Sequence, residues 1–383
     1  FTSPAAGTVV AVNRGARRAL VSVVIEIKES GGPDDNLAFE AYDADVELDG
    51  EKVRALLYES GMWTALRARP HDRVPSSEEE CASVFVTAID TRPLAGETTT
   101  VIAGREDDFT AGLGVLEHLT EGPVWLCKKA GSAIGAGQSQ KIQVAEFDGK
   151  HPAGLVGTHI HTLDPVGRKK TVWHIGAQDV VAIGHLFRTG TLDVSRVVAL
   201  GGPAVKEPRL LKTRIGASTD ALVNGELKDG EIRVVAGSVL GGRTAMGDEA
   251  GFLGRYHGQV SALAENRERE FLGWLKPGGN MFSTTRAFVS GFFPAKNFDF
   301  DTTTNGSHRA MVPIGMFEKV MPLDIMPTFL LRSLVVDDVG QAEKLGALEL
   351  VEEDLALCSF VSPGKEDFGV ALRRNLTDIW KEG

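Results

Sequence analysis

The stretch DFTAGLGVLEHLTEGPVWLCKK, residues 108–129, decides the fold class. Its first part has apolar residues at the three- and four-residue spacing of a helix that is buried on one face, and it ends near Gly122. The part that follows, PVWLCKK, is a short apolar run typical of a buried strand. Because a helix followed by a buried strand is the repeating unit of a parallel sheet, we predict an α/β layer.

The same alternation extends to both sides of this stretch. VRALLYESGMW (53–63) has helical spacing, and GAQDVVAIGHLFRTG (176–190) predicts a helix that ends at Gly190. SVFVTAI (83–89) predicts a buried strand. We therefore expect an α/β domain with a mostly parallel sheet over residues 46–194.

The segments outside this domain have other patterns. Residues 1–45 are β-rich, with two strand-like runs separated by a turn at 13–15, and we expect a natural N-terminal portion to precede Phe1. Residues 195–270 contain short strands around a small helix capped by Ser218, which predicts a β-grasp-like domain.

Residues 271–383 begin with aromatic loops rich in glycine and proline. Helical spacing follows near 314–335, 337–358 and 365–382, so we predict a helical C-terminal domain. The chain is thus predicted to be a multidomain protein of mixed α/β and α+β class.

Composition excludes several functions. The net charge of −11 argues against nucleic-acid binding and against docking on anionic lipid by charge alone. The longest apolar stretch is interrupted by Asp324, Pro327 and Arg332, so the sequence predicts no membrane span. Three cysteines that lie far apart fit a reducing compartment and show no metal-site spacing.

GMWTALRARP, residues 61–70, places Trp63, Arg67 and Arg69 in a predicted loop after a helix. An aromatic ring and two guanidinium groups could grip an anion or the carboxylates of a partner protein. An interdomain cluster of ion pairs is an equally good interpretation of the same residues.

GTHIH, residues 157–161, places His159 and His161 two positions apart, as on one face of a strand, with His151 and His174 nearby. Such a pair can bind zinc, but no spacing defines a third ligand, and polar residues at a domain contact are the simpler interpretation. The glycine-rich run GSAIGAG (131–137) lacks the spacing of a phosphate-binding loop and predicts a surface loop.

LALCSFVSPGK, residues 355–365, has the frame of an iron–sulfur motif with spacing C-x2-C-x2-C-x3-C-P. Its four ligand positions fall on Glu352, Leu355, Cys358 and Ser362. Leucine cannot ligate iron, and a single thiolate cannot hold a cubane cluster. The sequence therefore predicts no cluster here, and packing of a helix–turn–helix is a structural reason for the frame.

Several long strings resemble the family of the A subunit of the sodium-translocating NADH:quinone oxidoreductase, and the resemblance runs from Phe1 to Gly383. They are GMWTALRARPHDRVP, FVTAIDTRPLAGE, HPAGLVGTHIHTLDPV, RAMVPIGMFEKVMPLDIMPTFLLR and LGALELVEEDLALCSFVSPGK. The resemblance implies a barrel-sandwich module that is truncated here, a Rossmann-like α/β domain, a β-grasp domain of the soluble-ligand-binding (SLBB) type, and a C-terminal helical domain.

The resemblance also implies a place in a six-subunit respiratory complex on the bacterial inner membrane. NADH electrons pass through FAD, FMN, riboflavin and iron–sulfur centres of partner subunits to ubiquinone, and sodium is driven outward. The A subunit is the peripheral piece on the cytoplasmic face, without a cofactor of its own. Its partners are the other subunits, chiefly the membrane subunit with the quinone site, and quinone itself is a possible ligand.

The family is similar to the NADH- and flavin-binding subunit of respiratory complex I and to the C subunit of Rnf-type complexes. The glycine-rich flavin loop of those relatives aligns with residues 65–70, where side chains occupy the flavin's space. Their E-x-E-P motif aligns with residues 90–93, where Arg92 reverses one acidic position, and Ser362 departs from the cysteine usual in the A-subunit family itself. These departures predict a cofactor-free scaffold, and the resemblance implies that it docks near the quinone site.

Two other functions are consistent with the sequence. A self-sufficient flavin-dependent NADH oxidoreductase would use the α/β domain to hold its cofactor. A binding module for quinone or another small ligand would use the β-grasp domain.

Overall fold

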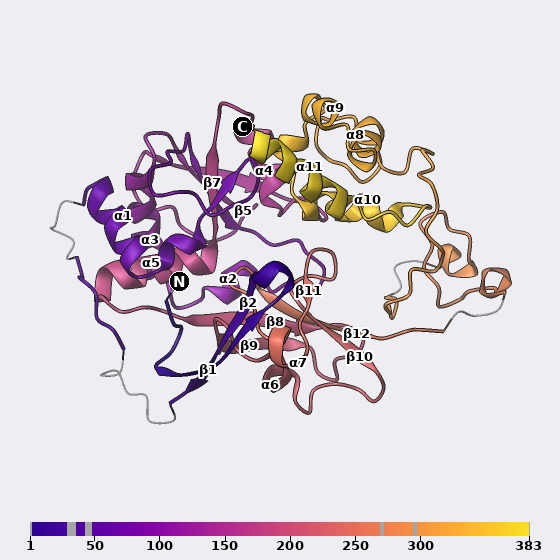
Figure 1. Ribbon diagram of the computed structural model, residues 1–383, viewed down its shortest axis with the longest axis horizontal. Helices are drawn as coiled ribbons and strands as arrows, with labels where there is room; N and C mark the ends of the chain where they lie inside the picture. Colours follow the sequence, from indigo (N-terminus) through magenta and orange to yellow (C-terminus); the bar gives the residue numbers. More distant parts are fainter. Residues whose placement is uncertain (1, 29–35, 43–47, 269–271, 294–296, 383) are drawn as a thin grey trace.

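The computed structural model describes residues 2–28, 36–42, 48–268, 272–293 and 297–382. Figure 1 shows an α/β part, a second sheet below it, and C-terminal helices that lie against both. The predicted boundaries at 45/46 and 270/271 lie outside the described residues.

The α/β sheet has the strand order β3-β7-β4-β5-β6. Strand β4 pairs in parallel with β5 and β7, β5 pairs in parallel with β6, and β3 pairs antiparallel with β7. The mostly parallel sheet is therefore confirmed. The strands are β3 (Arg67–Arg69), β4 (Val84–Ala88), β5 (Val124–Lys129), β6 (Ile142–Phe147) and β7 (Val172–Gly176).

Helices cover both faces of this sheet. On one face α1, α3 and α5 bury a large apolar core with β4, while on the other face Ile160 of α4 packs with Phe85 and Cys127. The sheet is thus the middle of three layers. The helices are α1 (Gly50–Glu59), α2 (Thr98–Val101), α3 (Glu106–Leu116), α4 (Val156–Leu163) and α5 (Ala177–Thr189), with a 3-10 turn, η3 (Met62–Ala65), after α1.

Helices α3 and α5 cross through glycines. A Cβ at Gly184 would lie 1.8 Å from Asp108 O, and one at Gly112 would lie 2.1 Å from Val180 O. No other residue type permits so close an approach of the two backbones. Helix α5 ends where Gly190 adopts a φ of 69°, as the sequence predicts.

The second sheet has the order β11-β10-β12-β8-β9, and only β12 and β8 pair in parallel. Between its strands, Ser218 caps α6 by accepting a hydrogen bond from Ala221 N, which confirms the predicted capped helix. The elements are β8 (Ser195–Gly201), β9 (Arg209–Arg214), α6 (Thr219–Val223), β10 (Ile232–Ala236), β11 (Arg243–Thr244), α7 (Gly247–Ala250) and β12 (Gln259–Ala264).

The N-terminal residues form an antiparallel hairpin of β1 (Gly7–Arg14) and β2 (Leu20–Ile27). The predicted turn at 13–15 is displaced, because β1 continues to Arg14 and a 3-10 turn at Ala16–Arg18 makes the connection. Among the described residues no helix is long and apolar enough to span a membrane.

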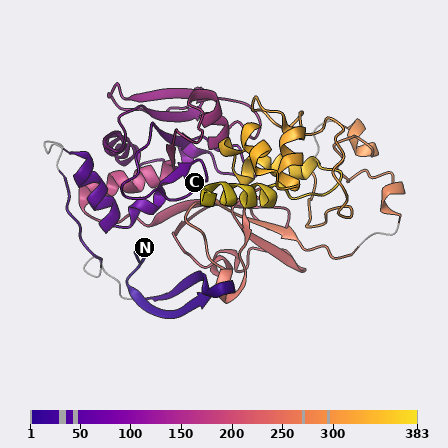
Figure 2. The ribbon, with the colours of Figure 1, turned by 45° about the horizontal axis from the view of Figure 1, so that its top comes forward.

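The C-terminal helices are α8 (Pro327–Val335), α9 (Val339–Lys344), α10 (Ala356–Val361) and α11 (Phe368–Glu382), with the 3-10 turn η8 (Glu352–Leu355) before α10. The predicted helix at 314–335 is too long, because residues 314–326 form turns and the helix starts with Pro327 in its first turn. Figure 2 shows α11 between the α/β part and the second sheet.

Candidate functional site

The strand order of the α/β sheet reverses between β4 and β7, at their carboxyl ends. Chain order runs from β4 through β5 and β6 on one side and then returns to β7 on the other side. In open α/β sheets, ligands bind in the crevice where the strand order reverses in this way. Here that crevice lies between the loop after Ala88 and the start of α5 at Ala177.

The chain's own second sheet covers this position. Gln259 of β12 donates from Nε2 to Pro93 O at 2.9 Å. Gln178 of α5 donates to Val197 O at 2.9 Å and accepts from Val197 N at 2.8 Å. These contacts join the strand ends to β8 and β12, so the crevice is an internal contact.

Arg92, in the loop after β4, lies at the centre of the arrangement. It donates from Nε and Nη2 to the two carboxylate oxygens of Glu353 at 2.6 and 2.7 Å, and from Nη1 to Asp90 at 3.2 Å. Burial opposes the charge on Arg92, but Glu353 and Asp90 outweigh burial and raise the pKa of Arg92 above its usual range. The guanidinium therefore stays charged and holds two carboxylates.

Glu353 belongs to an acidic strip, residues 349–354, with the sequence ELVEED. Arg69 of β3 is fully buried and donates to Glu349 O at 3.0 Å, and its Nη2 lies 3.5 Å from Asp354 Oδ2. His161 Nδ1 lies 2.6 Å from Glu349 Oε2. The α/β domain thus grips the strip through side chains from three of its elements.

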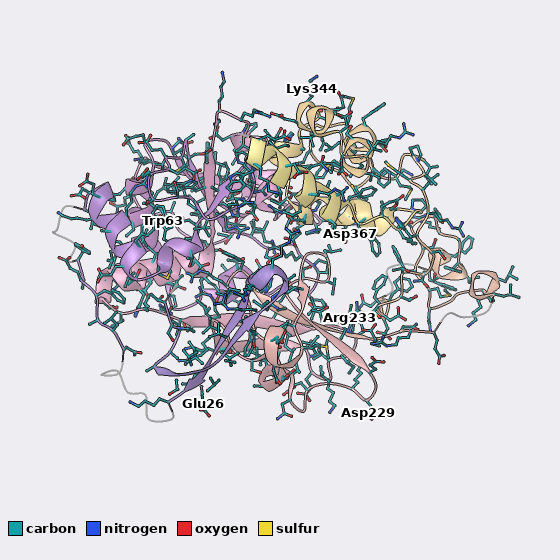
Figure 3. The ribbon with its side chains drawn as sticks, viewed as in Figure 1. Glu26, Trp63, Asp229, Arg233, Lys344 and Asp367 are labelled. Atoms are coloured by element: carbon teal, nitrogen blue, oxygen red, sulfur yellow. The ribbon has the colours of Figure 1, made fainter. Side chains whose placement is uncertain are left out.

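Helix α11 closes the other side of the acidic strip. Arg373 donates to both carboxylate oxygens of Glu352 at 2.6 Å and to His71 O at 2.7 Å. Asp367, at the start of α11 (Figure 3), accepts from Gly369 N at 3.1 Å and so orients this helix. We call the whole set of contacts between the acidic strip and residues Arg69, Arg92, His161 and Arg373 the ionic seam.

Two glycines let neighbouring elements approach the seam. A Cβ at Gly157 would lie 2.4 Å from Asp354 Oδ1, and one at Gly241 would lie 2.9 Å from Glu353 Cδ. The seam is thus a junction of the α/β domain, the second sheet and the C-terminal helices. Burial raises the pKa of Asp354 above its usual range, although the charge of Arg69 opposes this.

Asp72 forms a second ionic centre beside the seam. Arg67 Nη2 lies 2.6 Å and His174 Nε2 3.0 Å from its carboxylate oxygens, and Arg69 Nε lies at 3.9 Å. Burial opposes ionisation of Asp72, but these neighbours outweigh burial and hold its pKa well below the usual range. Arg67 also lies over the ring of Tyr256, which is in the turn before β12, at 4.8 Å from the ring centroid.

The predicted arginine cluster is therefore internal. Trp63, expected in a loop, is buried in η3, where its Nε1 donates to Pro75 O at 2.8 Å and its ring meets Trp173. It lies among the helices of the α/β domain (Figure 3). The structure brings Arg69 and His161 together at Glu349, and Arg67 to the chain's own Asp72.

The expected strand at GTHIH is wrong, because these residues lie in α4. A short apolar run does not distinguish a strand from a buried helix turn. On this helix His159 points away from His161: its Nε2 lies 3.0 Å from Ala153 O, and its ring packs against Phe147. Burial lowers the pKa of His159 to about 4, so it is neutral near pH 7.

The positions of the degenerate cluster motif are all engaged in packing or pairing. Glu352 pairs with Arg373, Leu355 and Cys358 are buried in the C-terminal core, and Ser362 donates to Glu366. Burial raises the pKa of the Cys358 thiol to about 12, so this thiol is protonated at neutral pH. Within the described ranges, no three His, Cys, Asp or Glu side chains are grouped so as to hold a metal ion.

Sequence reasoning identified Arg92, and it identified Glu352 as a position of the degenerate cluster motif, but it missed Glu353, Glu349 and Asp354 and the pairing of the strip with arginines. The run of four acidic residues within six positions was the available signal. Such runs are usually solvated, so the run alone does not indicate a buried junction.

Three family models match the chain. They are described as the NqrA N-terminal barrel-sandwich hybrid domain (residues 1–28), the NqrA second alpha/beta domain (48–192) and the NQRA C-terminal domain, of SLBB type (197–247). The matches support the multidomain α/β fold class with a barrel-sandwich module and an SLBB domain.

Curated relatives match along the whole chain. The A subunits of the Na(+)-translocating NADH-quinone reductases of Cellvibrio japonicus and Shewanella amazonensis are each 54% identical over 385 residues, which is 100% of this chain and 85% of the relative. The Haemophilus influenzae protein is 52% identical with the same coverage. An NAD+-reducing [NiFe]-hydrogenase structure shares 13% identity at a TM-score of 0.40, over 56% of this chain and 47% of that chain. The chain therefore belongs to the NqrA family, the A subunits of the Na+-translocating NADH-quinone reductases.

Proposed function

We propose that this chain is a cofactor-free scaffold, which supports electron transfer from NADH to ubiquinone by holding neighbouring subunits in place. The observation that carries the proposal is the ionic seam. Glu352 of the degenerate cluster motif pairs with Arg373, and its neighbours Glu353 and Asp354 pair with Arg92 and Arg69. Side chains bound in this way serve rigidity and are not available to a redox centre.

The filled crevice at the strand ends supports the same proposal. A nucleotide or flavin bound there would have to displace the contacts of Gln259 with Pro93 and of Gln178 with Val197. Each broken hydrogen bond would leave a polar group in need of a new partner, which costs roughly 1–3 kcal/mol.

The redox centres of the proposed electron path, flavins and iron–sulfur clusters, belong to partner subunits in this proposal. The chain docks on the membrane subunits near the quinone site, on the cytoplasmic face of the inner membrane, and the complex couples quinone reduction to Na+ export. Because the chain carries a net charge of −11, docking relies on protein complementarity more than on attraction to anionic lipid.

We also infer four domains, at 1–45, 46–194, 195–270 and 271–383. Separate apolar clusters in the α/β part, the second sheet and the C-terminal helices support the last three of these domains, and the separate two-stranded sheet of β1 and β2 supports the first. Limited proteolysis should cleave between these clusters first; cleavage first inside the α/β sheet would contradict the division.

Selective removal of this chain from the purified complex tests the scaffold proposal. Quinone reduction should fall, while NADH oxidation by an artificial acceptor persists, because the acceptor takes electrons before the quinone step. Re-addition of the chain should restore quinone reduction. Loss of both activities together, or of neither, would refute the proposal.

The flavin-enzyme alternative has a simpler test. The purified full-length chain should show no visible absorption and no NADH oxidation. A stoichiometric flavin spectrum with turnover would replace the scaffold proposal. Calorimetry with short-chain quinones tests the ligand-binding alternative in the same preparation, and saturable binding would favour it.

A further inference from the structure

Residues 272–293, which we call the arm, expose a dense set of apolar side chains. Phe292 is 85% exposed, Phe293 61% and Leu275 60%. The arm leaves the end of β12 and projects to the side away from α1 (Figures 1 and 2). Single exposed apolar residues are normal, but Phe292 and Phe293 are neighbours in sequence and both largely exposed, which is typical of a contact surface.

Hydrogen bonds join the segment before the arm to the segment after it. Thr302 N donates to Ala264 O at 3.2 Å, and Asn266 N donates to Thr302 Oγ1 at 2.9 Å. Within the arm, Val289 N donates to Pro277 O at 2.9 Å. The arm therefore has a defined backbone path and presents its apolar residues from a formed structure.

Aromatic packing joins the arm to the C-terminal helices. The ring centroid of Phe282 lies 5.6 Å from that of Phe298, 5.5 Å from that of Phe300 and 5.8 Å from that of Phe360 on α10. These rings are stabilised by packing against one another within the chain. Phe292 is instead 85% exposed to solvent.

The charge of the arm differs from that of the whole chain. Residues 272–293 contain Lys276 and Arg286 and no Asp or Glu, whereas the chain has a net charge of −11. A surface that complements the arm would be apolar at its centre and carry carboxylates at its rim.

We propose that the arm docks on a membrane subunit of the same complex, on an apolar surface rimmed by carboxylates. The inference rests on the proposed scaffold function and names the surface that would carry it out. Membership in the family of a multi-subunit reductase provides such a partner. A lipid surface fits less well, because lipid recognition uses about four to eight clustered basic residues and the chain's net charge of −11 opposes it.

The double substitution Phe292→Ser with Phe293→Ser tests the proposal in the full-length chain. Reconstitution with complex depleted of this chain should weaken by about 100-fold or more, since central aromatic anchors dominate the affinity of an interface. Val144→Ser is the matched control: Val144 is 46% exposed on the edge strand β6 of the α/β sheet, and its removal should leave affinity unchanged. Unchanged affinity of the double variant would overturn the proposal.

A photocrosslinker in place of Phe292 identifies the occupant. Crosslinks to a membrane subunit within reconstituted complex support the proposal. Crosslinks to lipid alone, or to none of the membrane subunits, overturn it. Circular dichroism and the melting temperature of the free chain should match wild type, because both phenylalanines are largely exposed.

Charge reversal at Arg286 provides a second test that does not touch the apolar residues. Arg286→Glu should slow association and weaken its salt dependence, as expected for complementary rims. Unaltered salt dependence would contradict the proposed carboxylate rim.

The scaffold function and the arm can fail separately. If the arm variants fail to reconstitute while the depleted complex still reduces quinone normally, the scaffold proposal is wrong and the docking proposal for the arm is supported. If removal of the chain abolishes quinone reduction but the arm variants bind normally, the docking proposal is wrong and the scaffold proposal is supported.

Discussion

Breaking the contact between Arg92 and Glu353 should release the C-terminal helices from the α/β domain. Arg92 holds both oxygens of Glu353 at 2.6 and 2.7 Å, across 261 residues of sequence. Glu353 lies in η8, directly before α10, so this pair fixes the start of that helix. The perturbation is Arg92→Ala, alone and combined with Glu353→Ala.

The expected coupling free energy between Arg92 and Glu353 follows from the burial of the two side chains. The Arg92 side chain is 31% exposed and that of Glu353 18%, so the pair is neither fully solvated nor fully buried. Exposed pairs contribute up to about 1 kcal/mol, and removing one partner of a buried pair costs about 3–5 kcal/mol. We therefore expect a coupling free energy of about 2 kcal/mol in a double-mutant cycle.

Amide hydrogen exchange is the right assay, because a multidomain chain does not unfold in one step. If the free energy of local opening falls by about 2 kcal/mol, hydrogen exchange at the amides of residues 352–361 should become about 30-fold faster. Arg209→Ala is the matched control: Arg209 holds Glu226 at 2.7 Å through two nitrogens, but both residues lie in the second-sheet part. That variant should leave exchange at 352–361 unchanged. Additive effects of Arg92→Ala and Glu353→Ala, within about 0.3 kcal/mol, would refute the reasoning.

Three further outcomes are expected. Gly184→Ala should destabilise the α/β domain by about 2 kcal/mol or more in urea unfolding, because its Cβ would meet Asp108 O at 1.8 Å, while Gly114→Ala, with open space around it, should be neutral or stabilising. Since the pKa of Asp72 is depressed in the folded state, its stabilisation is present above pH of about 4 and is lost as pH falls below that value; Asp72→Asn should reduce stability at pH 7 and flatten the acid limb of the pH profile. Burial raises the pKa of Cys358 to about 12, so a thiol reagent at pH 8 should label it only after denaturant is added, and rapid labelling of native protein would contradict its burial.

Local sequence patterns predicted some elements of the α/β domain and missed others, such as β6 and β7. The strand at 124–129 and the helix at 177–189 follow from apolar spacing and from glycine at the helix end. The helix predicted from 314 is wrong over its first part, where Pro313 and Pro322 restrict the backbone and Gly315 has a φ of 75°. The prediction relied on apolar spacing alone and ignored these helix-breaking residues.

The ionic seam could be predicted only in part. Arg92 stood out because it reverses the sign of an acidic position in distant relatives. Its partner could not be found from spacing, since the contact joins residues 261 positions apart. The same holds for Arg69, which the sequence placed in a loop and the structure places in a buried strand facing the acidic strip.

The seam and the arm both contact the short segment formed by η8 and α10, residues 352–361. Phe360 of α10 packs against the aromatic residues at the arm, and Glu353, just before α10, is held by Arg92. A partner that holds the arm would therefore also position the α/β sheet, without any large movement within the chain. If the chain contributes geometry to the complex, loosening the seam by Arg92→Ala and removing the arm's phenylalanines should impair the same step, quinone reduction, and leave NADH oxidation intact. If only the arm variants impair that step, the seam serves the stability of this chain alone.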